Sequence, residues 1–229
     1  MDTKSTDTNI KRIKASSNAY LVQNNGHLFM IDSGAGDIAN IEKACQEFGH
    51  ELFDLELIII THAHWDHVAN VKKLKNLTGA LVIAQQKAED NLLQGSASFP
   101  EGTSLFNKLL IYFIQFFSSN GGSFPSLRPD ILVNEVFSLQ NLGIDGRVDA
   151  VPGHTQGSLA VIIDSKHCFI GDTMFNLFPW SVYPLFANHE EHLKKSWQHL
   201  NKFISIETFY PGHGKPFSRK KFIKSYQKI

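Results

Sequence analysis

Apolar and polar positions change in short blocks along the chain, and these blocks predict strands and helices in alternation. Two apolar runs, Tyr20–Gln23 and His27–Ile31, flank an Asn-Asn-Gly sequence, which is typical of a β-hairpin with a primed turn. Leu55–Thr61 is a nearly continuous β-branched run, and such a run predicts a strand that is covered on both faces. Because strands of this kind alternate with helical segments, the pattern predicts an α/β layered fold.

Most of the remaining chain follows the same rhythm. Ile10 and Ile13 are placed to join an edge strand near the start of the sequence. Further strands are expected over 80–84, 131–137, 147–151, 159–164, 167–170 and 208–210. Helices are expected over about 37–48, 68–77 and 188–203, and from about 85 and about 218 onward.

One stretch, from about 94 to 130, departs from this rhythm. It is rich in Gly, Ser, Pro and Phe, and it contains the apolar segment Leu105–Phe117. At 13 residues this segment is too short to span a membrane but long enough for a helix. Three roles stay open for it: an ordinary buried helix, a wall or lid over an active site, or a homodimer or membrane-surface contact.

Length and composition narrow the class of protein. A chain of 229 residues with 42% apolar residues predicts a single domain over 1–229, interrupted by the apolar insertion. Its 22 basic and 22 acidic residues balance, which argues against binding to nucleic acid. The sequence contains neither an apolar run of 18 residues nor a secretory signal, and it has only two cysteines, Cys45 and Cys168. We therefore expect no membrane span, a reducing compartment and a cytoplasmic location.

The chemistry concentrates in a histidine-rich sequence directly after the 55–61 strand. His62, His64, Asp66 and His67 lie within six residues. Residues two apart at a strand end project in similar directions, so His62 and His64 can share one metal ion. The chain then turns, which directs Asp66 and His67 to a neighbouring position. A divalent cation removes the cost of burying these groups unpaired.

Three more candidate ligands follow later strands. They are His154 in a Pro-Gly-His sequence, Asp172 in Gly-Asp-Thr, and His213 in a second Pro-Gly-His sequence. Glycine beside a metal ligand allows the backbone to bend sharply and approach the ion. Five histidines and two aspartates are enough for two adjacent metal ions, and a donor set without thiolate favours Zn²⁺.

With these motifs in order from Ile31-Asp32-Ser33-Gly34 to Pro211-Gly212-His213-Gly214, the sequence resembles the metallo-β-lactamase-fold hydrolase superfamily over essentially its whole length. The resemblance is to its glyoxalase II and lactonase-like branch. It implies a four-layer αββα sandwich, two mixed sheets flanked by helices, with the metals between the sheet edges. It leaves Fe or Mn open beside Zn²⁺, because some members use them.

The resemblance also implies roles for individual residues. One metal would be bound by His62, His64 and His154, a second by Asp66, His67 and His213, with Asp172 between them. Asp32 matches an aspartate that orients the site without binding metal, although a helix N-cap is an alternative role for it.

The implied activity is hydrolysis by a hydroxide held between two metal ions, with a small-molecule substrate. Asp66 would orient this nucleophile and pass a proton to the leaving group. An ester, lactone or thioester is expected, while glutathione thioesters are disfavoured because little sequence follows His213 to build the extra domain that binds them. Trp180 and Tyr183 are expected to reach the substrate.

Two other activities stay open. One is a mononuclear iron enzyme similar to thiol or persulfide dioxygenases. The other is a catalytically silent binding module that keeps the fold, although the complete ligand set argues against it.

Overall fold

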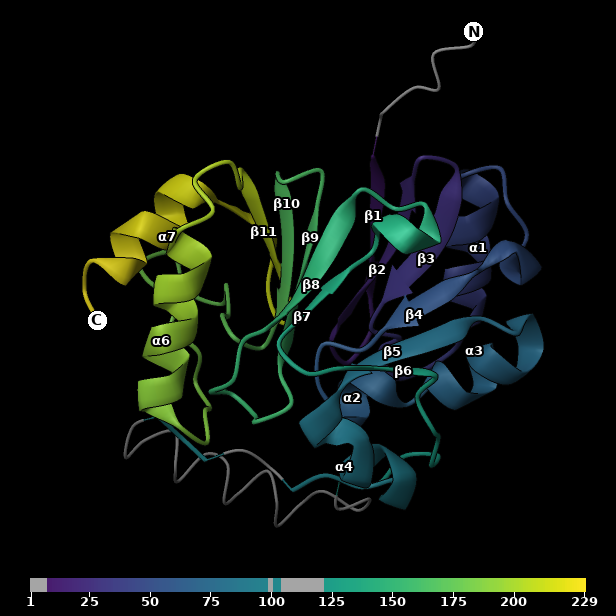
Figure 1. Cartoon of the computed structure of the whole chain (residues 1–229), viewed down its shortest axis with the longest axis horizontal. Coiled ribbons are helices and arrows are strands. Elements are labelled where there is room, and N and C mark those ends of the chain that lie inside the picture. The colour runs from purple at the N-terminus through teal and green to yellow at the C-terminus, as the bar shows by residue number, and fades with distance from the viewer. Residues whose placement is uncertain (1–7, 99–100, 104–121) are drawn as a thin grey trace, which may run out of the picture.

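Two mixed β-sheets stack face to face, and helices cover the outer face of each (Figure 1). This arrangement comes from a computed structural model that describes residues 8–98, 101–103 and 122–229. It confirms the predicted αββα sandwich. Within these residues, none of the helices combines the length and the apolar character needed to cross a membrane. The apolar segment Leu105–Phe117 lies outside the described residues.

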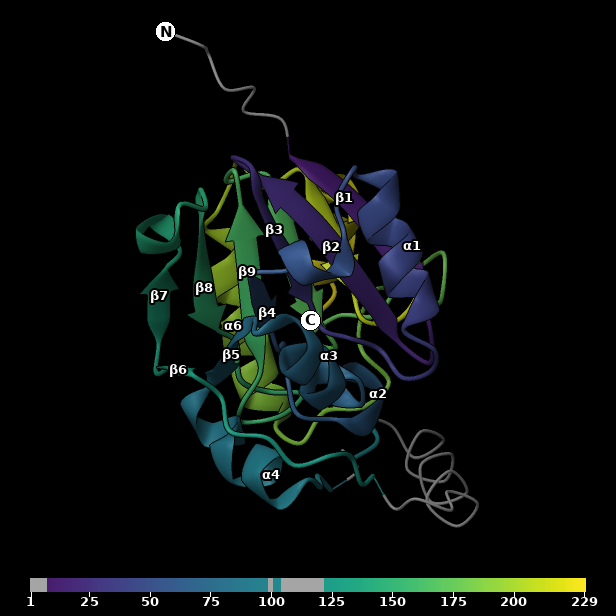
Figure 2. The same cartoon turned by 90° about the vertical axis from the view of Figure 1, so that its right-hand side faces the viewer.

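The first sheet contains six strands in sequence order. β1 to β3 are antiparallel and β3 to β6 are parallel, and α1 and α3 lie over the outer face (Figure 2). The strands are β1 (Asn9–Lys14), β2 (Asn18–Asn24), β3 (His27–Ile31), β4 (Leu57–Ile59), β5 (Leu81–Gln85) and β6 (Ile131–Val133). The helices are α1 (Ala39–Glu47), α2 (Trp65–Val68), α3 (Val71–Thr78) and α4 (Glu89–Gln94), with short 3₁₀ turns at Leu52–Asp54 and Gln86–Ala88.

The second sheet also has six strands, in the order β12-β11-β10-β9-β8-β7. Its pairs are antiparallel except β10 with β11. The strands are β7 (Val136–Ser138), β8 (Gly146–Ala150), β9 (Leu159–Ile163), β10 (His167–Gly171), β11 (Thr208–Pro211) and β12 (Phe217–Ser218). α6 (Glu190–Asn201) and α7 (Arg219–Tyr226) cover its outer face, and a 3₁₀ turn spans Gln140–Leu142.

Side-chain alternation along the strands explains why three layers of core form. In β2, Tyr20 and Val22 point into the core between the sheets, whereas Leu21 points into the core under α1. In β4, Ile59 faces the middle and Ile58 the helices, so this strand is covered on both faces as predicted. A third cluster lies between the second sheet and its helices.

The structure confirms the predicted turn between β2 and β3 but not the strand predicted over 131–137. Asn25 and Gly26 both have positive φ, 52° and 87°, which confirms the primed turn between β2 and β3. The single strand expected over 131–137 is wrong, because the structure has two strands there, β6 in the first sheet and β7 in the second. The chain crosses between the sheets at Asn134 and Glu135.

Candidate metal centre

All seven predicted ligands come from segments that follow strands or begin helices, and the fold brings them together in two groups. His62 and His64 follow β4, and Asp66 and His67 form the first turn of α2. The remaining three follow strands of the second sheet: His154 after β8, Asp172 after β10 and His213 after β11.

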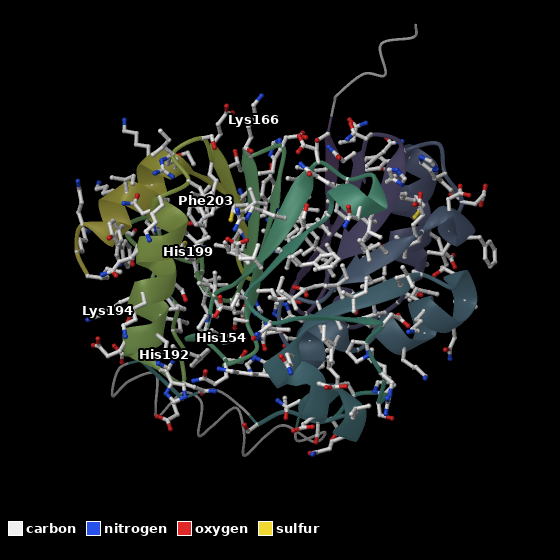
Figure 3. All side chains as sticks on the ribbon, in the orientation of Figure 1. His154, Lys166, His192, Lys194, His199 and Phe203 are labelled. Carbon is white, nitrogen blue, oxygen red and sulfur yellow. The ribbon has the colours of Figure 1, made fainter. Side chains whose placement is uncertain are left out.

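α6 lies against the His154 loop. In Figure 3, His154 lies beside the end of α6 at which His192 is labelled. Two backbone hydrogen bonds hold this contact, from His189 N to Gly153 O (3.0 Å) and from Asn188 N to His154 O (3.1 Å). A Cβ at position 153 would lie 2.5 Å from the Leu193 backbone, so glycine is required for this approach.

The first group joins three imidazoles around one point. Nδ1 of His64 lies 2.9 Å from Nε2 of His62 and 3.1 Å from Nε2 of His154. All three side chains are buried. Nitrogens bound to a tetrahedral zinc ion at about 2.0–2.1 Å lie about 3.3 Å apart, so this spacing is close to that of three ligands to one ion.

The second group lies on the other side of Asp172. Oδ2 of Asp66 is 3.3 Å from Nε2 of His213 and 3.7 Å from Nε2 of His67. The Asp172 carboxylate lies 3.4 Å from both of these nitrogens. It also lies 3.6 Å from Nε2 of His154 and 3.9 Å from Nε2 of His62, and therefore lies within reach of both groups.

Hydrogen bonds on the outer side of three rings fix which nitrogen faces the centre. Nδ1 of His154 donates to Phe186 O (2.9 Å), and Nδ1 of His67 donates to Asp32 Oδ2 (2.8 Å). Nδ1 of His62 lies 3.1 Å from Thr61 Oγ1. With a proton on each Nδ1, the Nε2 lone pairs point inward, as metal binding requires.

Asp32 connects the two ligand segments that come from the first sheet. Its buried carboxylate accepts hydrogen bonds from Thr61 N and Thr61 Oγ1, both 2.7 Å, as well as from His67. Because Thr61 Oγ1 donates to Asp32, it is free to accept from His62. The alternative role as a helix cap is wrong: α1 begins after Ile38, and Asp37 accepts from Ala39 N instead.

Burial keeps the first group neutral. It lowers the pKa of His62 well below its ordinary value, with a further contribution from neighbouring imidazoles. It lowers the pKa of His64 to about 3 and also lowers that of His154. Neutral imidazole is the form that binds metal.

In the second group, neighbouring carboxylates determine the pKa values of the histidines. Burial alone would lower the pKa of His213 and His67, but Asp172 and its neighbours raise the pKa of His213 to about 10 and that of His67 well above its ordinary value. Burial alone would raise the pKa of Asp172, yet the charges of His213 and His67 hold it well below its usual range.

Unsatisfied polar atoms are the sign that these side chains suit a cation. Among the described residues, three buried side-chain atoms have no hydrogen-bond partner: His67 Nε2, Asp172 Oδ1 and Thr173 Oγ1. Two of them, His67 Nε2 and Asp172 Oδ1, face the centre. Buried polar atoms normally have partners, and a cation bound here would be the partner of both. Imidazole and carboxylate donors without thiolate fit divalent cations such as zinc.

Gly212 makes the close approach possible. A Cβ at this position would lie 2.2 Å from Asp172 Oδ1 and 2.5 Å from His67 Cε1. Any side chain would therefore push apart two of the proposed ligands. The Pro-Gly-His pattern signals this requirement in the sequence.

A cavity of about 280 Å³ opens onto the centre. Its lining includes five of the proposed ligands: His64, Asp66, His154, Asp172 and His213. The other described residues of the lining are mainly apolar, and they include Trp65, Phe175, Leu177, Leu185 and Phe186. The expected substrate contacts Trp180 and Tyr183 lie in the same stretch of sequence as four of these residues, but the individual wall residues gave no signal because apolar side chains resemble ordinary core positions.

Trp180 and Tyr183, the two residues predicted to contact substrate, do not line this cavity. Trp180 is 62% exposed and stacks on Phe178. The Tyr183 hydroxyl donates to Glu190 (3.2 Å), and burial together with Glu190 raises the pKa of Tyr183 to about 12. Neighbouring residues of the same loop, Phe175 and Leu177, face the centre instead.

Comparison with known proteins gives one family. The profile of the metallo-beta-lactamase superfamily matches residues 13–213. A protein named "Probable metallo-hydrolase" from Methanocaldococcus jannaschii is 27% identical, over 93% of this chain and 94% of its own. A hydroxyacylglutathione hydrolase from Methylobacterium nodulans is 28% identical over 79% of this chain. The chain spans 55% of the length of that enzyme.

Solved structures share the fold at low sequence identity. The B3 metallo-beta-lactamase BLEG-1 superposes with a TM-score of 0.69 at 20% identity, covering 95% of this chain and 97% of its own. A protein solved in a di-iron-bound form superposes with a TM-score of 0.64 at 21% identity, covering 93% of this chain and 95% of its own.

Proposed function

The chain belongs to the metallo-beta-lactamase superfamily, a family of metal-dependent hydrolases, and from this we propose that it hydrolyses a small ester, lactone or thioester with two bound zinc ions. The observation that carries the proposal is the convergence of seven donor side chains in two adjacent groups, five of which line one cavity together with apolar side chains. His62, His64 and His154 would hold one ion. Asp66, His67 and His213 would hold the other, with Asp172 shared.

Two divalent cations, when bound here, supply Lewis acidity toward a carbonyl oxygen and an activated water as nucleophile. Asp66 is the residue we assign to proton handling. Its side chain lies at the cavity surface, and the positive charge of His67 outweighs burial to lower the pKa of the Asp66 carboxyl. As a carboxylate it can take the proton that the attacking water loses and later give that same proton to the leaving group.

The cavity walls support an uncharged substrate. Trp65, Phe175 and Leu177 present apolar surface next to the proposed ligands, and no lysine or arginine is among the described residues of the lining. An apolar group beside the reacting carbonyl would be held by these walls and shielded from water. A large anionic part of a substrate would find no lysine or arginine to pair with among the described wall residues.

Metal content and hydrolysis together test this function. The purified full-length protein should contain two zinc ions per chain and act on at least one of a lactone, thioester, β-lactam and phosphodiester panel. His62→Ala and Asp66→Ala should each reduce hydrolysis by about two orders of magnitude or more, since each removes a proposed ligand. His189→Ala, which changes an exposed histidine outside the two groups, is the matched control.

Three results would contradict the proposal. Full activity in either ligand variant, or after complete chelation, would rule out metal-dependent hydrolysis. One iron per chain with oxygen consumption in the presence of a thiol would instead support the mononuclear dioxygenase. Zinc binding with no turnover of any substrate class would support the silent module.

A further inference from the structure

The hairpin formed by β1 and β2 reaches across from the first sheet to the last loop of the second. Asn18, the first residue of β2, donates its backbone N–H to Gly212 O (2.7 Å). Its side-chain Nδ2 donates to Pro211 O (2.9 Å) and to Gly214 O (2.8 Å). One residue therefore binds three carbonyls of the four-residue loop that carries His213.

Two further hairpin residues bind the same loop. The Tyr20 hydroxyl donates to Pro211 O (2.7 Å), and burial raises the pKa of this phenol, which keeps its proton in place. Arg12 donates from Nη1 to Gly214 O (2.8 Å). Because Asn18 and Tyr20 are buried, water cannot substitute for them in these hydrogen bonds.

The turn of the hairpin also touches the other segment of the second group. Ser17, buried between β1 and β2, donates from Oγ to Asp66 O (2.7 Å). The hairpin thus holds the backbone of both Asp66 and the His213 loop, which enter the centre from different sheets.

The first group is oriented by other residues. Its rings depend on Thr61 Oγ1 for His62 and on Phe186 O for His154. None of the hydrogen bonds of the described hairpin residues goes to His62, His64 or His154.

We propose that Ser17, Asn18 and Tyr20 are positioning residues that set cation affinity at the Asp66–His67–His213 group and leave the His62–His64–His154 group unaffected. This inference rests on the proposed two-metal function. Its physical basis is that a loop held by several hydrogen bonds keeps its ligand in place before the ion arrives, so less ordering entropy is lost on binding.

Stepwise metal affinities of full-length variants test the proposal. Asn18→Ala removes two of the loop contacts, and Tyr20→Phe removes one hydroxyl with little change in packing. Tyr210→Phe is the matched control, since its hydroxyl lies 3.0 Å from His167 Nδ1 and its ring packs against Tyr20 and Phe169. Each protein would be stripped of metal and titrated with Zn²⁺ against a chromophoric chelator, and with Co²⁺ by absorption spectroscopy.

The expected result is selective. Asn18→Ala should weaken one of the two zinc equivalents by on the order of 10-fold or more, with a smaller loss in Tyr20→Phe. The other equivalent and its Co²⁺ spectrum should match wild type, and Tyr210→Phe should match at both steps.

Two results would overturn the inference: both zinc affinities unchanged in Tyr20→Phe and Asn18→Ala, or an equal loss at both steps. Tyr20→Phe keeps the test valid if Asn18→Ala does not fold. Wild-type protein that binds one ion would instead overturn the two-metal function, together with any role of the hairpin in it.

Discussion

Neighbouring histidines of the centre are held in opposite protonation states when no cation is present. The pKa of His64 is about 3, because burial disfavours its charge, and that of His213 is about 10, because Asp172 and Asp66 outweigh burial. Two imidazoles of the same centre thus differ in pKa because one has mainly apolar and imidazole neighbours and the other has carboxylate neighbours.

These shifts predict how the stability of the chelated protein depends on pH. The unfolded value for both residues is 6.5. The lowered pKa of His64 gives stability that is present above pH 6.5 and lost as the pH falls toward 3. The raised pKa of His213 gives stability that is present below pH 6.5 and lost as the pH rises toward 10.

Unfolding temperatures measured with a chelator should therefore peak near pH 6.5, and His213→Ala should reduce the loss on the alkaline side. A steady rise from pH 6.5 to about 9 would contradict this.

Asp32 offers a second test at the level of one residue. In Asp32→Ala, His67 loses the acceptor that fixes its Nδ1 proton, and Thr61 loses two hydrogen bonds. Zinc affinity should fall about 10–100-fold, the usual cost of removing a partner of a metal ligand. Asp37→Ala, whose exposed carboxylate only accepts from Ala39 N, should keep wild-type affinity. Equal affinities in a chelator competition assay would show that Asp32 has no such role.

The sequence identified the side chains that face the centre but few of the groups that orient them. His62, Asp66 and Asp172 stand in short motifs with a chemical meaning, so the motifs alone identified them as candidate metal ligands. The acceptor for His154 is a backbone carbonyl, Phe186 O, and no residue type signals it. Asn18 is likewise far from every motif, and only tertiary structure brings it to the His213 loop.

At the level of elements, α6 supports the loop that carries Asp172. Trp197 of α6 is fully buried and donates from Nε1 to Thr173 O (3.0 Å), next to Asp172. Its ring also packs against Phe222 of α7. The helix thus connects the outer core of the second sheet to one wall of the centre.

Replacing this ring should be costly. Trp197→Ala should lower the free energy of unfolding by about 3–5 kcal/mol, because it leaves a large cavity and an unpaired carbonyl. Trp180→Ala, at a side chain that is 62% exposed, should change it by less than about 0.5 kcal/mol. Denaturant titration of both variants measures the difference. If Trp197→Ala lost as little stability as Trp180→Ala, burial of the Trp197 ring would contribute little to the free energy of unfolding.

Strands and helices were predictable where one local pattern decides the structure. The β2–β3 turn follows from Asn-Gly chemistry. α7 begins at Arg219, in agreement with the start predicted at about 218, and the structure shows Ser218 as its cap. The prediction for the 131–137 segment failed because apolar residues resume directly after Asn134 and Glu135, where the chain changes sheets, so the two short strands look like one. A run of β-branched residues carries no information about which sheet it joins.

At the level of the whole molecule, the two sheets share one core. Phe29 and Ile59 of the first sheet pack in the same buried cluster as Val161 and Phe169 of the second. Removing either sheet would expose this apolar surface to water. We therefore expect the chain to unfold as one unit, consistent with the single domain predicted from its length.

The two cysteines test this expectation. Cys45 lies on the buried face of α1, and Cys168 of β10 lies in the outer core of the second sheet; burial raises the pKa of Cys45 to about 11 and that of Cys168 further. Neither should react with iodoacetamide at about pH 8 in the native protein, because the thiolate is scarce and covered. With rising denaturant both should become reactive in one transition. Peptide mass spectrometry distinguishes them, and separate midpoints would show two independently unfolding halves.

The crossover between β6 and β7 divides the proposed ligands between the two sheets. Four of them precede it and three follow it. Neither half of the polypeptide holds a complete donor set, so a reactive centre exists only after the sheets have docked. An unfinished or misfolded chain would thus lack the proposed two-metal centre, so the proposed hydrolysis could begin only in a completely folded molecule.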